Sequence, residues 1–389
     1  MTESSWTPPA SLRGLASRAW MVGAVGAAAS AVGFFVDPSQ FHQSYLTAWL
    51  FWIALTLGCL AILMLHHLSR GAWGLMIRRT LEAAIRTLPL LLLLFVPNLL
   101  GLEDLYLWAR PEAVDDPLIQ HKALYLNPMA FTIRSLLYLT IWMLFAFALN
   151  RLSLRQDETA DPGLFRRLQM ISAPGLVVFC LLSTFAAIDW IMSLDPHWYS
   201  SIFGVYFITG EGVAGFAFAS IVALYLSLRP PLAGVLKPKH FHDYGKLLLA
   251  FVMLWSYMAV SQLLIVWSGN LPEEAPWYLD RVAGGWKWIS ILLILFHFLL
   301  PFLLLLSRDL KRNARLLAGV AFLVLCIRWV DFFWLVSPTF HHHLRPHWLD
   351  LATMLAIGGV WVGVFTRQLG RHPLLPVNDP FLEEALTDG

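Results

Sequence analysis

Ionisable side chains inside apolar segments are the residues of this chain whose types could support chemistry. Glu211 and His297 each lie near the middle of an apolar segment, and Arg328 and Asp331 are three residues apart in a third. A three-residue spacing places two side chains on one face of a helix. A charged group at the bilayer centre costs at least about 2.5 to 3.5 kcal/mol, so such residues face a protein interior, a partner or a water path.

A short loop between two apolar segments carries further polar groups. Asp189 precedes this loop, and Asp195 and His197 lie within it. With a helical rise of about 1.5 Å per residue, Glu211 and His297 are each expected roughly 13 Å below the surface at which this loop lies. By the same rise, Arg328 is expected about 12 Å, Asp331 about 7 Å and Asp189 about 5 Å from that surface. Such a series could relay protons or hydrogen-bond a quinone head group.

Each of these residues also has a purely structural interpretation. Arg328 and Asp331 could form an internal ion pair that orients a helix, and His297 could be a hydrogen-bonded packing residue. Asp189 lies close enough to the membrane surface to be a helix-end acid. Glu211 is harder to explain structurally, because its own segment contains no lysine or arginine, and an intramembrane acid is by default a candidate functional residue.

Two apparent motifs do not predict a site. Gly210, Gly212 and Gly215 match the pattern GxGxxG, but they lie inside an apolar segment with no preceding strand, which argues against nucleotide binding. Small residues there favour close helix packing, and the same holds for glycines 23, 26 and 33 near the N-terminus. The cluster His341, His342, His343 and His347 lies in a loop without defined spacing, so we predict no metal site there.

The composition indicates an integral membrane protein. Of the 389 residues, 58% are hydrophobic and 13% are charged, with a mean hydropathy of +0.64, whereas a soluble domain has about 25% charged residues. The three cysteines lie in different apolar segments and form no CxxC motif. An iron-sulfur cluster or zinc site on this chain is therefore not expected.

Ten apolar segments reach the length of about 20 residues that a spanning helix requires. We predict an all-α fold of about ten transmembrane helices in a single membrane domain covering residues 1–389. Residues 368–389 of this domain are expected to form a cytoplasmic tail. The expected spans are 19–36, 45–68, 80–100, 130–149, 171–192, 202–228, 247–267, 288–306, 316–336 and 349–364.

Basic residues predict the orientation of these spans. Of the 27 lysines and arginines, 19 fall before the first span, after the last or in the loops on that same side, 5 fall in the opposite loops and 3 fall inside spans. Because positive loops stay in the cytoplasm, we expect both termini to be cytoplasmic. The longest opposite loop, residues 101–129, contains Tyr106 and Trp108 and is expected to fold as a cap that docks a partner.

Three blocks of the second half resemble a known family. They are IDWIMSLDPHWYSSIFGVYF (188–207), GKLLLAFVMLWSYMAVSQLLIVWSGNLPEEAPWYL (245–279) and HFLLPFLLLLSRDLKR (297–312). In this order and spacing they resemble the second NrfD-type, polysulfide-reductase-like membrane subunit of alternative complex III, the bacterial quinol:cytochrome c oxidoreductase. Asp189, Asp195 and His197 lie in the first block, and His297 begins the third.

The resemblance implies an architecture and a set of partners. The second to fifth and sixth to ninth helices would form two four-helix bundles, with two peripheral helices beside them. The partners would be a related NrfD-like membrane subunit, a periplasmic iron-sulfur subunit and c-type cytochrome subunits, in the bacterial inner membrane. Iron-sulfur clusters and c-type haems would then belong to the partners, and quinol or menaquinol would be the only cofactor this chain could bind. Membrane lipid surrounds the chain, and we expect no nucleic-acid partner.

The expected function is therefore that of a subunit in respiratory electron transfer. It would contribute to quinol binding or to proton translocation through Asp189, Glu211, His297, Arg328 and Asp331, and by itself it would have no complete reaction. Two alternatives stay open. The chain could be a proton-coupled secondary transporter, or it could be a purely structural membrane anchor.

Overall fold

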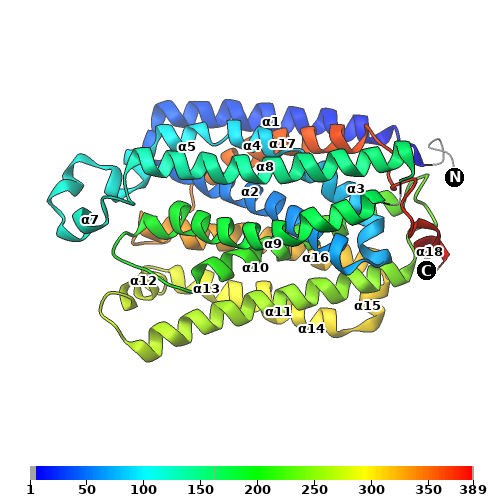
Figure 1. Ribbon diagram of the computed structural model, residues 1–389. Helices are drawn as coiled ribbons and strands as arrows, with labels where there is room; N and C mark the ends of the chain where they lie inside the picture. Colours follow the sequence, from blue (N-terminus) through cyan, green and yellow to red (C-terminus); the bar gives the residue numbers. More distant parts are fainter. Residues whose placement is uncertain (1–5, 162, 388–389) are drawn as a thin grey trace.

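The computed structural model describes residues 6–161 and 163–387, and helices are the regular elements of this part of the chain. None of the described residues lies in a strand. Ten helical segments are long and apolar enough to cross a membrane, and Figure 1 shows the long helices running side by side along one direction. The chain is an all-α, multi-pass membrane protein, as predicted.

The ten membrane-spanning segments account for most of the labelled helices. They are Ser11–Val36 (α1), Pro38–Ser69 (α2), Ala72–Leu100 (α3, Ala72–Ile85; α4, Leu88–Leu93; α5, Val96–Leu100), Pro128–Thr159 (α8), Gly163–Leu194 (α9, Gly163–Trp190), Phe203–Ser227 (α10), Pro238–Gly269 (α11), Trp286–Leu306 (α13, Trp286–Leu293; α14, Leu300–Leu306), Ala314–Thr339 (α16, Ala314–Val336) and Trp348–Leu369 (α17). The shorter helices are α6 (Leu102–Leu105), α7 (Pro117–Lys122), α12 (Ala275–Asp280), α15 (Arg308–Arg312) and α18 (Leu382–Thr387).

Each predicted span overlaps an observed one, but several helices are longer than their apolar cores. Helices α2, α8 and α11 have 32 residues each. Polar caps extend them: Asp37 accepts a hydrogen bond from the backbone of Gln40, and Asn127 accepts one from that of Ala130. Backbone hydrogen bonding continues past the lipid boundary where such groups satisfy the helix end.

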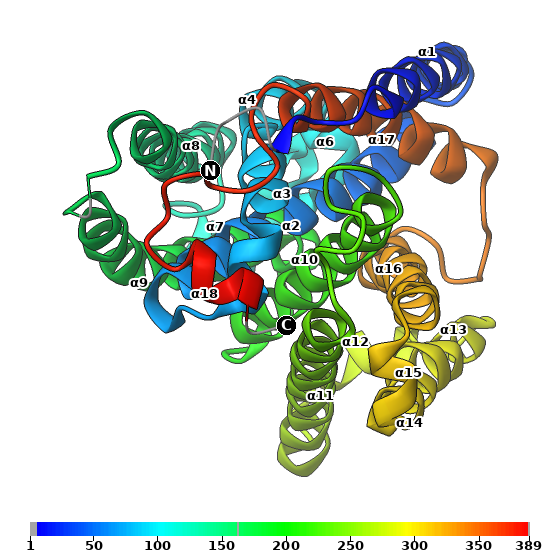
Figure 2. The same ribbon diagram turned by 90° about the vertical axis from the view of Figure 1, so that its right-hand side faces the viewer.

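The spans form two four-helix bundles and a separate pair, as predicted. The first bundle contains α2, the α3–α5 segment, α8 and α9, and the second contains α10, α11, the α13–α14 segment and α16. The two bundles meet where α2 packs against α10. Helices α1 and α17 lie side by side, and α17 also packs on α2 (Figure 2).

Small residues allow the α1–α17 pair to pack closely. A Cβ atom added at Gly23 would lie 2.8 Å from the backbone nitrogen of Val360, and one at Gly26 would lie 2.8 Å from the Cα of Ala356. Real Cβ atoms do not approach that closely, so the backbones touch only because these residues are glycines. The helix-packing prediction for residues 23, 26 and 33 is confirmed.

The first and last described residues, Trp6 and Thr387, lie at the same end of the molecule (Figure 1), which we call the terminal end. The N–H of Leu374 donates to the carbonyl of Trp6 at 3.0 Å. At the opposite end, Trp108 donates to the carbonyl of Ser193 at 3.0 Å. Residues 101–127 therefore fold against the bundle as a cap.

The third span is broken inside the membrane. Helix α3 ends at Ile85, Arg86 and Thr87 form a turn, and α4 begins at Leu88 with Pro89 in its first turn. Proline removes a backbone donor and is tolerated at a helix start. The break opens a gap beside α8, which is described below.

Candidate functional site

Five buried polar side chains from three spans meet inside the second bundle, and we call them the central cluster. Arg328 links them, because it pairs with Asp331 and interacts electrostatically with Glu211 and His297. Tyr206 completes the cluster by binding Asp331. None of the five side chains is more than 4% exposed. The structure thus brings together four of the residues that the sequence singled out.

Arg328 and Asp331 form the ion pair expected from their three-residue spacing on α16. Nη1 of Arg328 donates to Oδ2 of Asp331, and the hydroxyl of Tyr206 donates to Oδ1 at 2.7 Å. A Cβ atom at Gly210 would overlap the guanidinium, so glycine there makes room for it. Nε and Nη2 of Arg328 have no hydrogen-bond partner among the described residues. The guanidinium therefore keeps donors for a further acceptor.

Glu211 is fully buried on α10, and its carboxyl group is not hydrogen-bonded. Neither oxygen has a partner among the described residues, and the same is true of the hydroxyl of Ser183. The hydroxyl of Ser183 on α9 and the guanidinium of Arg328 are the polar groups near enough to affect the charge of this carboxyl. Burying an ionised carboxylate without partners is very costly. Such a group is suited to carry a proton as a neutral acid.

His297 lies in a π-helical turn, Ile294–Leu299, between α13 and α14. Pro301 follows four residues later and supplies no N–H to the carbonyl of His297, which favours a widened turn. The imidazole ring stands edge-on to Trp255, with ring centroids 4.0 Å apart. Both ring nitrogens lack hydrogen-bond partners among the described residues. Isolated π-turns are frequent at functional sites.

Asp189 lies apart from the central cluster, in the first bundle. Arg134 of α8 donates Nε and Nη2 to its two oxygens at 2.9 and 2.8 Å, and Tyr138 donates to it at 2.8 Å. Arg134 also donates to the carbonyl of Tyr125 and lies over its ring. The carboxylate is fully buried and well paired, which matches the structural interpretation of a helix-end acid.

Asp195 and His197 lie at the opposite end of the molecule and join two loops there. Nε2 of His197 is 2.8 Å from Oδ2 of Asp116, and its backbone N–H donates to Asp195 at 3.2 Å. The pKa of Asp116 is lowered by the backbone N–H of Leu118, with a smaller contribution from His197. These groups are partly exposed and do not belong to the central cluster.

The loop histidines hold structural hydrogen bonds. His341 pairs with Gln40 at 3.1 Å, and His347 caps α17 by accepting from the backbone of Leu349. Among the residues that the structure describes, no group of three histidines, cysteines or acids could hold a metal ion.

A second buried charge network lies near the terminal end, and it was not predicted from the sequence. Arg78 and Arg79 both pair with Glu82 on α3, Arg79 also pairs with Asp157 of α8, and Arg78 pairs with Asp379 at 2.7 Å. The spacing of Arg78, Arg79 and Glu82 was the available signal, since three or four residues separate partners on one helix face. The tail is therefore docked rather than free, although residues 388–389 lie outside the described part of the chain.

Comparison with known proteins does not identify the chain. No family model matches it, and no curated protein matches it.

Proposed function

We propose that this chain is a membrane subunit of a quinol-oxidising complex of the alternative complex III type. In this proposal the central cluster binds a quinone head group or passes the protons released by quinol oxidation. The single observation that carries the proposal is that Glu211 and His297, both enclosed in protein, have no hydrogen-bond partners among the described residues, while each interacts electrostatically with Arg328. The three blocks of family-like sequence support it independently.

The residues of the cluster suit that role for chemical reasons. A quinone head group has two oxygens that accept hydrogen bonds, and Arg328 retains unused donors. A quinol donates hydrogen bonds instead, and the carboxyl of Glu211 and the imidazole of His297 can accept them. Quinone, when bound, would supply the redox chemistry, and electrons would leave through the iron-sulfur and haem groups of the partner subunits.

The orientation belongs to the same proposal. The terminal end carries most of the arginines and lysines, so it would face the cytoplasm of a bacterium. The opposite end, with the folded cap, would face the periplasm, where the iron-sulfur and cytochrome subunits are expected to dock.

A proton-coupled transporter is the second candidate, because two spans are interrupted. The third span breaks at Arg86 and the eighth contains the π-turn, and broken helices are typical of transporter sites. The breaks are not in corresponding positions: one falls in the second helix of its bundle and the other in the third. This favours the oxidoreductase proposal.

Two experiments in sequence test the proposal. The chain is first purified from its native membrane in mild detergent, and co-purifying c-type haem and an iron-sulfur protein are expected in the optical spectrum and by mass spectrometry. A colourless chain without partners, recovered in good yield, would favour the transporter or another function.

The second experiment replaces Glu211 by Gln in the complex and measures quinol:cytochrome c turnover together with proton release. We expect at least one of them to fall about tenfold or more, in the range of a lost proton-transfer group, while the complex still assembles. The control is Asp243→Asn, which removes a half-buried acid near the start of α11 that pairs with Lys246 and is not part of the central cluster. Unchanged turnover and proton release would exclude Glu211 from the reaction.

A further inference from the structure

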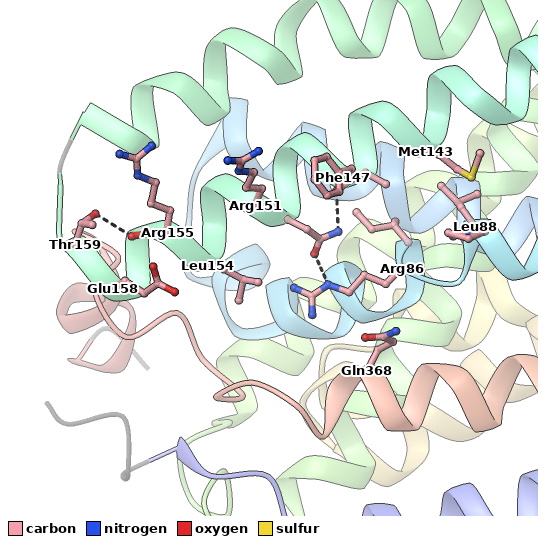
Figure 3. A pocket seen from close by; sticks show the side chains of 14 residues that line it. Arg86, Leu88, Met143, Phe147, Arg151, Leu154, Arg155, Glu158, Thr159 and Gln368 are labelled. Atoms are coloured by element: carbon pink, nitrogen blue, oxygen red, sulfur yellow. Dashed lines mark hydrogen bonds between the residues drawn. The ribbon is translucent and has the colours of Figure 1, made fainter.

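A pocket opens between α8 and the broken third span, on the half of the protein nearer the terminal end. Its volume is about 660 Å³, within the usual range for small-molecule sites. Figure 3 shows the side chains that line it, which come from α3, α4, α8 and α17. The pocket lies at the break of the third span, since Ile85 at the end of α3, Arg86 of the turn and Leu88 at the start of α4 all line it.

The wall formed by α8 changes from apolar to cationic along the helix. Met143, Phe147, Arg151 and Arg155 are spaced four residues apart and all line the pocket, so they form one stripe on the helix surface. Because α8 runs toward the terminal end, the two arginines lie nearer that end than the two apolar residues. Figure 3 shows Arg151 and Arg155 next to each other along the helix.

The facing wall changes in the same direction. Leu88 and Pro89 line the deeper part of the pocket. The third span runs from the terminal end toward the opposite end, so Arg86, which precedes these two residues, lies closer to the terminal end. Nε of Arg86 donates to Asn150 at 2.9 Å, which fixes this side chain at the pocket (Figure 3). Both walls therefore pass from hydrocarbon to guanidinium groups at about the same level.

The two arginines that α8 contributes to the pocket are not neutralised by the described residues. Arg151 and Arg155 are exposed, and neither guanidinium has an ion pair or hydrogen bond within the described residues. Glu158 is the one carboxylate among the described lining residues. The pocket thus has an excess of positive charge next to an apolar surface.

We propose that this pocket binds an anionic phospholipid. The phosphate would lie among Arg86, Arg151 and Arg155, and an acyl chain would cover Met143 and Phe147. Guanidinium groups bind phosphate with paired hydrogen bonds, and basic pockets between transmembrane helices bind anionic head groups. A free phosphate would not use the apolar half, and a neutral quinone would leave the guanidinium groups of Arg151 and Arg155 without an anion. The proposal does not depend on the proposed function.

Native mass spectrometry of the delipidated full-length protein, with added phosphatidylglycerol, tests the proposal. We expect Arg151→Gln/Arg155→Gln to bind this lipid about 25-fold more weakly than the wild type. Phosphatidylcholine, which has no net charge, should bind weakly to both. The matched control is Arg315→Gln, which removes an exposed arginine near the start of α16, outside the pocket.

Three results would overturn the proposal: equal phosphatidylglycerol binding by the double variant and the wild type, equally tight binding of phosphatidylcholine by the wild type, or displacement of the lipid by excess inorganic phosphate. If the double variant does not fold, Glu158→Gln decides the question. Removing this exposed carboxylate should strengthen phosphatidylglycerol binding severalfold. Unchanged or weaker binding in this variant would contradict the proposal.

Discussion

Gly58 of α2 lies directly against the backbone carbonyl of Glu211 on α10, so closely that a Cβ atom at Gly58 would overlap it. The two four-helix bundles therefore come into backbone contact at the level of the buried carboxyl group. Gly215, one turn further along α10, packs on the same part of α2. The glycines that resembled a nucleotide-binding motif thus let helices approach, and Gly210 makes room for Arg328.

Replacing Gly58 by Ala should force α2 and α10 apart. We expect a loss of about 1 to 3 kcal/mol in the free energy of unfolding, the usual cost of overpacking a tight contact. Thermal unfolding in detergent measures it. The matched control is Gly319→Ala on α16, where an added Cβ atom meets nothing within 4 Å, so stability should stay the same or rise slightly. Equal effects at both positions would contradict the close contact.

Removing Arg134 should destabilise the first bundle, because it leaves the fully buried Asp189 without its cation. We expect Arg134→Gln to lower the free energy of unfolding by about 3 kcal/mol, the lower part of the range for a broken buried pair, since Arg134 is 19% exposed. Tyr138→Phe, which removes one hydrogen bond to the same carboxylate, should cost about 1 kcal/mol. Chemical denaturation compares the two, and a larger loss in Tyr138→Phe would refute this ranking.

Replacing Asp379 by Asn should release the C-terminal segment from α3. The carboxylate of Asp379 binds Arg78 at 2.7 Å with both side chains fully buried, so its loss removes one of the two carboxylates that pair with this arginine and breaks the link between the tail and α3. Hydrogen exchange over residues 370–387 should become faster in Asp379→Asn. Exchange should be unchanged in Glu384→Gln, which alters an exposed acid of α18. Equal protection in the wild type and Asp379→Asn would show that other contacts hold the tail.

Stability should fall in mild acid partly through His372. Burial, together with the nearby Arg86 and Arg79, lowers the pKa of His372 to about 4 from its ordinary value of 6.5. Between these two values the unfolded chain binds a proton that the folded chain does not, so folding weakens as the pH drops. His372→Gln removes this contribution. Its melting temperature should therefore fall less than that of the wild type between about pH 7.5 and about pH 5; an identical fall would disprove the assignment.

The sequence predicted the number of spans and the placement of Arg328 and Asp331 on one helix face, because both follow from local patterns. An apolar run of sufficient length indicates a spanning helix, and a three-residue spacing places two side chains on one face. The position of Asp189 depended on Arg134, a residue on a different helix, and no spacing in the sequence links the two. The docked tail was not predicted for the same reason, since Arg78 and Asp379 are separated by 301 positions.

The α1–α17 pair has a consequence for how the protein is made. Helix α1 is synthesised before α17, yet its main contact is with α17, and among the described elements no other helix covers the glycine face of α1 to a comparable extent. During synthesis α1 must therefore stay in the membrane with this face against lipid until the ribosome has finished residues 348–369. The α1–α17 pair can form only after the spans of both bundles have been synthesised, so truncation before α17 would leave the glycine face of α1 exposed to lipid.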